Sequence, residues 1–392
     1  MSFRLKVPSA GSLRLRSLRL RSGQAGQAGQ ARLGYDLPQR GNALEREKPM
    51  KAIRIHAHGG GEQLRIEELD APQPGPRQIR IEVRAAALNQ LDLWVRKGIP
   101  GVRLPVIPGS DAAGVVTQMG SAVTQFAVGD KVLPQPGYGC GLCAACHSGR
   151  EQYCLRYGIL GEHKDGVQAE SIVVDEDRAI RMPSNASFAE AAAMPLVFLT
   201  AWEMLVNKGG VRPGDTVLVV AASSGVGSAA VQIAKLHAAR VIATAGTAKL
   251  EKARALGADF VLDHYQQDVA KEVKTITGGR GVDIVVDHVG AATWQVSLRC
   301  LAKGGKLILC GSTTGPEVKM DLRFLYIRQQ SILGSTMGSR GDLYRIMQLV
   351  EAGKLRGVVD RVFPFTEVAQ AHQYLESGQH FGKVVLSFEK RV

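Results

Sequence analysis

The stretch TVLVVAASSGVGSAAVQIAK, residues 216–235, decides the fold. Five apolar residues, 217–221, run into a turn of small residues at 222–227, and an Ala-rich segment follows. A continuous apolar run is typical of a strand buried on both faces of a parallel sheet. Small residues at the turn let the first backbone N–H groups of the helix approach a pyrophosphate. The stretch therefore predicts strand, turn and helix, with four cofactor-binding residues at the turn: Ser224, Gly225, Val226 and Gly227.

The turn departs from the strict Gly-x-Gly-x-x-Gly fingerprint of dinucleotide-binding folds. Ala222 and Ser224 stand at the first two glycine positions, and only Gly227 keeps the third. A buried strand–helix turn that binds no nucleotide is the alternative interpretation. Further apolar runs at βαβ spacing favour the nucleotide site, because they predict an alternating α/β chain with a doubly wound parallel sheet. These runs are residues 239–244, 260–262, 284–286 and 306–310.

The composition is that of a globular protein of about two domains, with 392 residues, 45% hydrophobic and 22% charged. The net charge of +13 is uneven, because residues 1–49 hold ten Lys and Arg but only three Asp and Glu. No basic stripe with interleaved aromatic residues stands out in the other residues. We therefore expect no nucleic-acid partner.

Residues 1–49 differ in composition from the rest of the chain. The sequence SLRLR occurs twice between 12 and 21, and Gly-Gln-Ala occurs three times between 23 and 31. Such a segment cannot bury enough apolar surface to fold, so we expect a disordered extension before Met50. A mitochondrial transit peptide is the alternative, but its leucines form no helical stripe. No apolar run of about 18 residues is present, so we expect a cytoplasmic protein without a membrane span.

Short strands and turns follow from Met50. Ile79, Ile81 and Val83 alternate with charged residues, and Pro and Gly interrupt the chain at 72–76. Period-two alternation between Pro- and Gly-containing turns indicates antiparallel strands with one buried face. A β-rich domain is therefore predicted before the nucleotide-binding domain.

Four of the six cysteines lie within fifteen residues, at Cys140, Cys143, Cys146 and Cys154. Disulfides are rare in intracellular proteins. Four thiolates at this spacing can surround Zn²⁺ tetrahedrally and leave no open position, which makes such a metal structural. We expect one structural zinc ion; free thiols or a redox pair are the alternative.

From Met50 onward, the order of these parts resembles the medium-chain dehydrogenase/reductase superfamily. The resemblance rests on the MKA start, the segment 89–98, the Pro-Gly-Ser-Asp turn at 108–111, the cysteines, the segment 191–205 and the nucleotide turn, with FGKVV at 381–385. It implies a GroES-like catalytic domain over 50–196, completed by 337–392. A Rossmann domain over 197–336 would interrupt it, and the active site would lie in the cleft.

The chain departs from the zinc alcohol dehydrogenases at the positions that bind catalytic zinc. The resemblance assigns Asn89, Ser110 and Met194 to these positions, and all three are poor zinc ligands beside thiolate and imidazole. The active-site half instead resembles the zeta-crystallin-like quinone oxidoreductases and enoyl reductases. We therefore expect no catalytic zinc, and an NAD(P)H-dependent oxidoreductase that delivers hydride to a quinone or to a conjugated enone or enoyl compound.

Three residues are candidates for the catalytic chemistry. Asn89 is a candidate hydrogen-bond donor to the oxygen on which negative charge develops. His163 is a candidate proton donor, with a solvent-exposed loop histidine as the alternative. Asp92 is the third candidate, although orienting the backbone or pairing with Arg96 is the more common role of such an aspartate.

The cofactor expectation is NADPH, with NADH as the alternative. No acidic residue follows the second strand of the nucleotide domain until Glu251, so nothing there repels a 2′-phosphate. Thr247 and Lys249 could contact that phosphate. The resemblance also suggests Thr200 and Gly311 as cofactor-binding residues.

Two further expectations concern assembly and rival functions. Residues 331–336 read as an edge strand, which predicts a homodimer, with a tetramer as the alternative. One rival function is an alcohol or aldehyde dehydrogenase with a metal site rebuilt from Asp92, Asp111 or His163. The other is a nucleotide-binding protein without turnover.

Overall fold

The structure is a computed structural model that describes residues 48–389. These residues belong to one compact unit. The predicted disordered extension lies outside the described residues, except for its last two positions.

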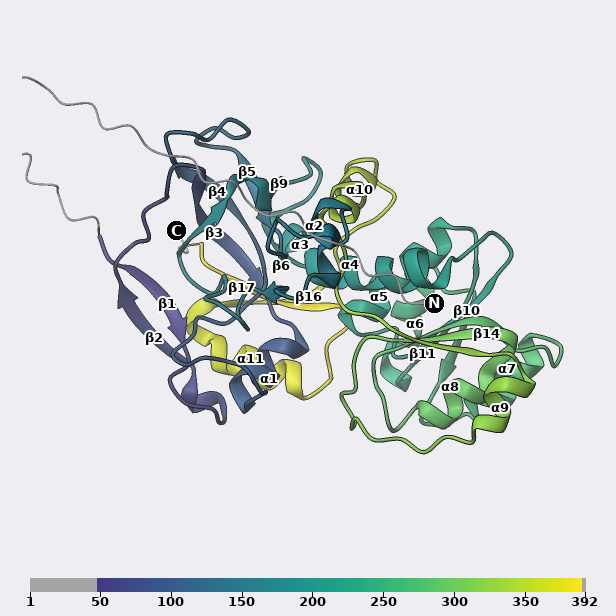
Figure 1. The fold of residues 1–392 in the computed structure, drawn as a ribbon. Helices are drawn as coiled ribbons and strands as arrows, with labels where there is room; N and C mark the ends of the chain where they lie inside the picture. Colours follow the sequence, from purple (N-terminus) through teal and green to yellow (C-terminus); the bar gives the residue numbers. More distant parts are fainter. Residues whose placement is uncertain (1–47, 390–392) are drawn as a thin grey trace, which may run out of the picture. The chain divides into compact units, whose positions relative to one another are not determined.

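A six-stranded parallel sheet contains the stretch quoted first (Figure 1). The strand order is β12-β11-β10-β13-β14-β15, and the prediction of a doubly wound parallel sheet is confirmed. The order reverses beside β10, and ligands of such folds bind at that reversal, outside the carboxyl ends of the strands. The strands are β10 (Thr216–Val219), β11 (Arg240–Ala245), β12 (Phe260–Asp263), β13 (Val282–Asp287), β14 (Leu301–Leu309) and β15 (Ser331–Gly334).

Both faces of this sheet are covered by helices. Alternate residues of β10 face different cores: Val217 and Val219 pack with α5, whereas Leu218 packs with α7 and α8. This is why the sequence shows an uninterrupted apolar run instead of an alternating one. The helices of this half are α4 (Pro195–Trp202), the π-helix η4 (Glu203–Gly209), α5 (Gly225–Leu236), η5 (Thr247–Lys249), α6 (Leu250–Ala255), α7 (Val269–Ile276), α8 (Trp294–Cys300) and α9 (Leu322–Ile327).

The turn after β10 is tight. The strand ends at Val219, earlier than the apolar run suggested, and Ala221 has a φ of 50°, in the left-handed region. The Ser224 hydroxyl then caps α5 by accepting from Gly227 N at 2.8 Å. A Cβ on Gly227 would lie 2.3 Å from Ala221 O, so only glycine allows the helix to pack this closely on the strand.

A seven-stranded sheet forms the other half, in the order β16-β17-β3-β4-β5-β9, with β8 also paired to β3. All its pairs are antiparallel except β16 with β17, which confirms the predicted antiparallel β region. Ile79, Ile81 and Val83 of β3 are buried, as their alternation predicts. The strands are β3 (Gln78–Ala87), β4 (Asp111–Met119), β5 (Lys131–Pro134), β8 (Ser171–Asp175), β9 (Ala179–Arg181), β16 (Val359–Pro364) and β17 (Lys383–Ser387).

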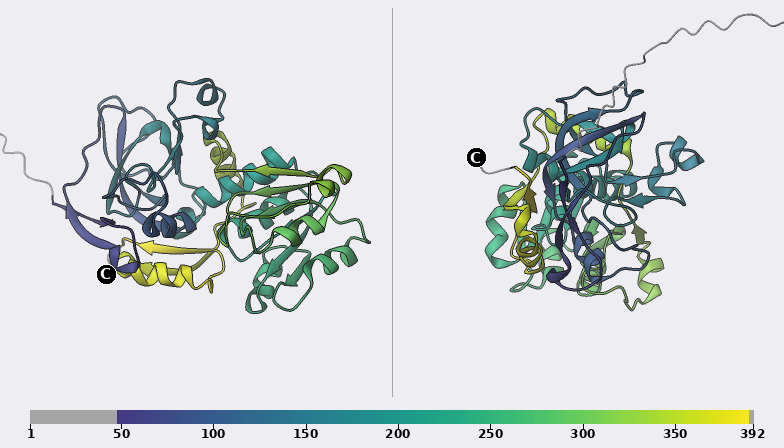
Figure 2. Two further views of the ribbon diagram at one scale, coloured as in Figure 1. Left: turned by 60° about the horizontal axis from the view of Figure 1, so that its bottom comes forward. Right: turned by 90° about the vertical axis from the view of Figure 1, so that its left-hand side faces the viewer.

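The C-terminal strands thus return to the half formed by the N-terminal strands, and Figure 2 shows the yellow strand and helix beside the purple and blue elements. Two smaller pairs are β1 (Met50–Arg54) with β2 (Arg65–Leu69), and β6 (Gly137–Tyr138) with β7 (Gly158–Ile159). The helices here are η1 (Gly61–Gln63), α1 (Gln90–Lys97), α2 (Ala144–His147), η2 (Glu151–Tyr153), η3 (Glu176–Arg178), α3 (Phe188–Ala192), α10 (Arg340–Glu351), η6 (Phe365–Glu367) and α11 (Val368–Glu376). Within residues 48–389, no helix combines the length and apolar character needed to cross a membrane.

Candidate functional site

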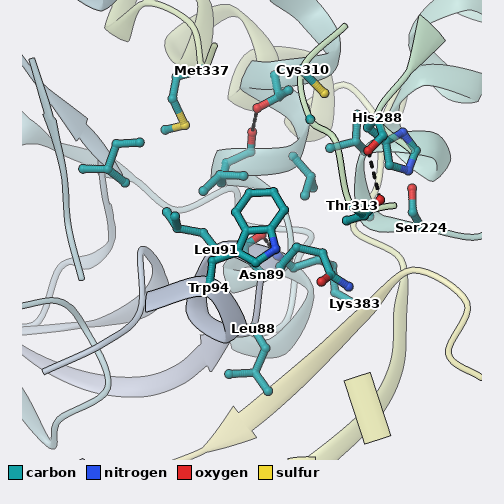
Figure 3. A pocket seen from close by; sticks show the side chains of 18 of the residues that line it. Leu88, Asn89, Leu91, Trp94, Ser224, His288, Cys310, Thr313, Met337 and Lys383 are labelled. Carbon is teal, nitrogen blue, oxygen red and sulfur yellow. Dashed lines mark hydrogen bonds between the residues drawn. The ribbon is translucent and has the colours of Figure 1, made fainter. Parts of the chain in front are cut away.

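A cavity of about 500 Å³ lies where the two halves meet (Figure 3). One wall comes from the half that contains the seven-stranded sheet, here called the catalytic half, and this wall is largely apolar. The other wall contains the nucleotide turn and the ends of β13 and β14. In Figure 3, Trp94 and Leu91 lie near Asn89, whereas His288, Thr313 and Ser224 lie together on the other side. The apolar lining includes Leu88, Leu91, Trp94, Leu196, Val197 and Met337.

Asn89 lies in the cavity wall at the start of α1 and belongs to a buried polar network. Its Nδ2 donates to Asp111 Oδ2 at 2.9 Å, and its Oδ1 accepts from Lys383 Nζ at 2.5 Å. Lys383 Nζ also lies 3.1 Å from Asp111 Oδ2, and these two side chains are only 4% and 0% exposed. The ion pair therefore fixes the orientation of the Asn89 amide.

Asp92 is not among the residues that line the cavity. Its Oδ2 accepts from Asn89 N at 2.7 Å, so the carboxyl group holds the start of α1. Burial raises the pKa of Asp92 to about 7, against the opposing effects of the Asn89 N–H and the Lys383 charge. This placement suits a positioning role, and a catalytic role for Asp92 stays a prediction.

Of the two common roles named for Asp92, the structure shows the contact with the backbone, whereas Arg96 has other partners. Arg96 instead binds Glu376 Oε1 at 2.6 Å and the ring of His372 at 3.3 Å, both on α11. The sequence pattern could not reveal this, because α11 lies about 280 residues further along the chain.

Ser110 and Met194 are the other two residues assigned to the positions of catalytic-zinc ligands. The Ser110 hydroxyl donates to Leu160 O at 2.7 Å and is fully buried. Met194 is fully buried and does not line the cavity. Neither side chain therefore offers an atom to an ion in the cavity.

His163 lines the cavity and is half exposed. Its Nδ1 accepts from Ile159 N at 3.2 Å, so Nε2 carries the proton of the neutral ring. Glu162 Oε2 lies 3.6 Å from the same Nδ1. His163 thus lines the cavity with one ring N–H, and its role as a proton donor stays a prediction.

Five of the eight predicted cofactor-binding residues line the cavity: Thr200, Ser224, Gly225, Val226 and Gly311. Gly227 lies behind them, where it lets α5 pack on the strand. Gly227 N and Ser228 N of α5 are bonded to Ser224, which leaves the N–H groups of Gly225 and Val226 without a partner within the helix. This wall therefore has the features of a pyrophosphate site.

Thr247 and Lys249 do not line this cavity. The Thr247 hydroxyl donates to Asp263 Oδ2 at 2.5 Å, and Lys249 Nζ donates to Gly378 O. A 2′-phosphate contact by either residue would have to compete with these hydrogen bonds, so their role stays a prediction.

Sequence reasoning missed several polar residues of the cavity, among them Lys383, His288 and His380. Lys383 lies within the FGKVV stretch that supported the resemblance, but its role was not visible there. His288 and His380 each have a buried Nδ1 without a hydrogen-bond partner. A histidine directly after an apolar strand, as at 288, is the signal that could have identified one of them. Cys310 also borders the cavity.

The four cysteines of residues 140–154 converge as expected. All four Sγ atoms lie within 4.8 Å of one another, with Cys143 and Cys146 separated by 3.6 Å. Four sulfurs about 2.3 Å from one zinc ion would be nearly 3.8 Å apart, so the set fits tetrahedral zinc. The Leu142 N–H lowers the pKa of Cys140 to about 6, which favours the thiolate.

Two family models match the chain. The model described as "Alcohol dehydrogenase GroES-like domain" matches residues 75–184, and the model described as "Zinc-binding dehydrogenase" matches residues 225–352. Together they cover parts of both halves of the fold.

Individual relatives are similar over nearly their whole length. A quinone oxidoreductase of Pseudomonas aeruginosa is 32% identical, over 86% of this chain and 99% of that protein. An acryloyl-coenzyme A reductase of Metallosphaera sedula is 31% identical, over 86% of this chain and 100% of that protein. A solved structure of an NAD-dependent alcohol dehydrogenase has a TM-score of 0.85 and 49% identity, over 87% of this chain and 100% of that chain.

Proposed function

This chain belongs to the medium-chain dehydrogenase/reductase superfamily, and from that premise we propose that it is an NADPH-dependent reductase of quinones or conjugated enone and enoyl compounds. The observation that carries the proposal is the Asn89–Asp111–Lys383 network at the cavity wall. The resemblance assigns Asn89 to a position that binds catalytic zinc in the zinc alcohol dehydrogenases, and here Lys383 Nζ donates to its Oδ1 at 2.5 Å. Relatives named quinone oxidoreductase and acryloyl-coenzyme A reductase support the acceptor class.

A reduced nicotinamide, bound at the wall formed by Ser224–Val226 and Gly311, would supply a hydride. An acceptor that is already activated needs no Lewis acid, but it needs donors at the oxygen where charge develops. Asn89 has a second Nδ2 proton, and Lys383 has a third, beyond those given to the network. His163 would take up a proton from solvent and, as the imidazolium, deliver one proton to the reduced acceptor, which returns the ring to its neutral form.

The apolar wall has a role in the same chemistry. Leu91 and Trp94 stand at the cavity, where they exclude water from the acceptor. Exclusion of water strengthens the hydrogen bonds from Asn89 and Lys383 to a developing negative charge. We propose that this wall receives the hydrophobic part of the acceptor.

We also propose one zinc ion at Cys140, Cys143, Cys146 and Cys154, with a structural role. All four thiol groups would be ligands, so no position is left for substrate. The nearby η2 helix contacts the rest of the protein through Glu151, whose Oε1 accepts from Gln135 Nε2 at 3.1 Å. The ion would therefore hold a surface segment that packs against the domain.

The direct test is cofactor oxidation with a panel of quinones, enones and aldehydes. We expect NADPH oxidation with quinones or enones by a protein that holds about one zinc per chain. Replacing Asn89 by Ala should lower kcat by about 100-fold, the usual effect of losing one donor to a developing oxyanion. Equal kcat in the parent and Asn89→Ala would contradict the assigned role.

Cofactor preference has its own test. We propose NADPH because no acid follows β11, although Lys249 is already bonded to Gly378 O. Lys249→Ala should reduce the ratio of kcat/KM for NADPH over NADH by about tenfold if the ammonium group turns to the phosphate. An unchanged ratio would refute the part assigned to Lys249.

A second candidate function is an alcohol dehydrogenase with a catalytic metal, which the name of the 49% identical structure favours. Against it, the four cysteines are the only group of three or more potential metal ligands found among residues 48–389. Alcohol oxidation that requires a second metal ion per chain would establish this candidate. Cofactor binding without turnover of any acceptor would instead indicate a nucleotide-binding protein.

A further inference from the structure

His380 lies in the loop between α11 and β17 and lines the cavity. Its side chain is 8% exposed, and its Nδ1 has no hydrogen-bond partner. Buried polar atoms in native proteins nearly always have a partner, so an unpaired one beside a cavity points to a ligand that supplies it.

The loop of His380 is held at three places, two of them at the nucleotide turn and one at Lys249 of η5. Gly382 N donates to Ser223 O at 2.8 Å, and Lys249 Nζ donates to Gly378 O. The stem of Lys383 packs against the turn, since a Cβ on Gly225 would lie 2.9 Å from Lys383 Cδ. Residues 378–383 therefore cover the N-terminus of α5.

The charges around His380 favour an anion. Burial and the charges of Lys249 and Lys383 lower the pKa of His380 to about 4, and the negative charge of Asp360 opposes this effect. The imidazole is thus neutral near pH 7 and has one N–H to donate. The N-terminus of α5, a helix of 12 residues, adds partial positive charge and free N–H groups at the same place.

We propose that His380 donates a hydrogen bond to the pyrophosphate of the dinucleotide, so that the catalytic half contributes a phosphate contact across the cleft. The proposal rests on the proposed function, because it requires a dinucleotide cofactor. The 2′-phosphate is the other phosphate of NADPH, but its expected partners Thr247 and Lys249 do not line the cavity. His380 lines the same cavity as Ser224, Gly225 and Val226, and its loop is bonded to the nucleotide turn through Gly382 N and Ser223 O, which favours the pyrophosphate.

The test measures the dissociation constants of four ligands: NADPH, NADH, ADP and adenosine. Each is measured for the parent protein and for the variants His380→Phe and His380→Gln. His380→Phe keeps the ring volume but has no N–H, so we expect about tenfold weaker binding of NADPH, NADH and ADP. Adenosine has no phosphate, and its binding should not change. Because glutamine keeps an N–H donor, His380→Gln should restore most of the affinity.

A matched control is His372→Phe. His372 is also a buried histidine with an unpartnered ring nitrogen, but it faces Arg96 and does not line the cavity. Its variant should bind all four ligands like the parent, with any effect confined to the melting temperature. Equal weakening by both Phe variants would show a packing effect and overturn the proposal.

Two other results would also overturn it. Unchanged dissociation constants in His380→Phe would show that the imidazole does not touch the cofactor. Weaker NADPH binding with unchanged NADH and ADP binding would place His380 at the 2′-phosphate. A parent protein that binds none of the dinucleotides would instead refute the proposed function itself.

Discussion

Removal of the Lys383 charge is the most informative perturbation of this fold. Lys383 of β17 and Asp111 of β4 form an ion pair of 3.1 Å that is almost completely buried. The Lys383→Met variant keeps most of the side-chain volume and leaves the Asp111 carboxylate without its counter-charge. Loss of one partner of a buried pair typically costs about 3–5 kcal/mol of the free energy of unfolding.

The structure places the expected cost at the lower end of that range, about 3 kcal/mol. Asp111 retains two hydrogen bonds, from Asn89 Nδ2 at 2.9 Å and from Leu196 N at 2.8 Å, and these stabilise its charge. Asp111→Asn in the Lys383→Met background removes the unpaired charge. The double variant should therefore be more stable than the sum of the single effects predicts, by about 2 kcal/mol.

The assay is urea unfolding of the parent, both single variants and the double variant, with zinc present. Lys235→Met is the matched control, because Lys235 and Asp259 form a 2.8 Å pair that is 36% and 35% exposed. Such a pair contributes about 0–1 kcal/mol. Additive effects at Lys383 and Asp111, within about 0.5 kcal/mol, would refute the reasoning.

Three further predictions concern pH, metal and assembly. The pKa of Asp92, raised to about 7, means that the folded protein binds a proton more tightly there than the unfolded chain. The Asp92 contribution to stability should therefore fall from about pH 4 to about pH 7 and stay level above, by at most about 1.4 kcal/mol per pH unit. Urea unfolding of Asp92→Asn should lack this decline, and identical pH profiles would contradict it. Elemental analysis should give about one zinc per chain, lost when Cys143 and Cys146 are both replaced by Ser; two zinc ions per chain would argue for a catalytic metal. Light scattering should return a dimer, because β15 (331–334) is the edge strand of its sheet and pairs on one side only among residues 48–389; a monomer at micromolar concentration would exclude pairing through β15.

Patterns within short segments predicted much of the fold. The apolar run at 217–221 indicated a strand covered on both faces, and alternation at 79–83 indicated a strand covered on one. These predictions succeed because side-chain direction along a strand repeats every two residues, so burial leaves a direct mark on the sequence. The end of β10 at Val219 was less well predicted, since the following apolar residues enter a turn.

Local spacing also determined the two clearest site features. The cysteines at 140–146 converge because three of them lie within seven residues, and the small residues at 222–227 create a tight approach to α5. In both cases the residues that act together are neighbours in the chain. The geometry is therefore limited by a few backbone angles.

Only the tertiary structure decided which side chains face the cavity and which partners they have. Asn89 and Lys383 are 294 residues apart, yet their side chains are joined at 2.5 Å. Asp92, three residues from Asn89, turns away from the cavity to bind a backbone N–H. His380 lines the same cavity as the nucleotide turn because β17 returns to the sheet of β3. A sequence pattern records whether a side chain is buried, but the partner it meets depends on how separate elements pack, and that packing arises from many weak contacts distributed over the whole chain.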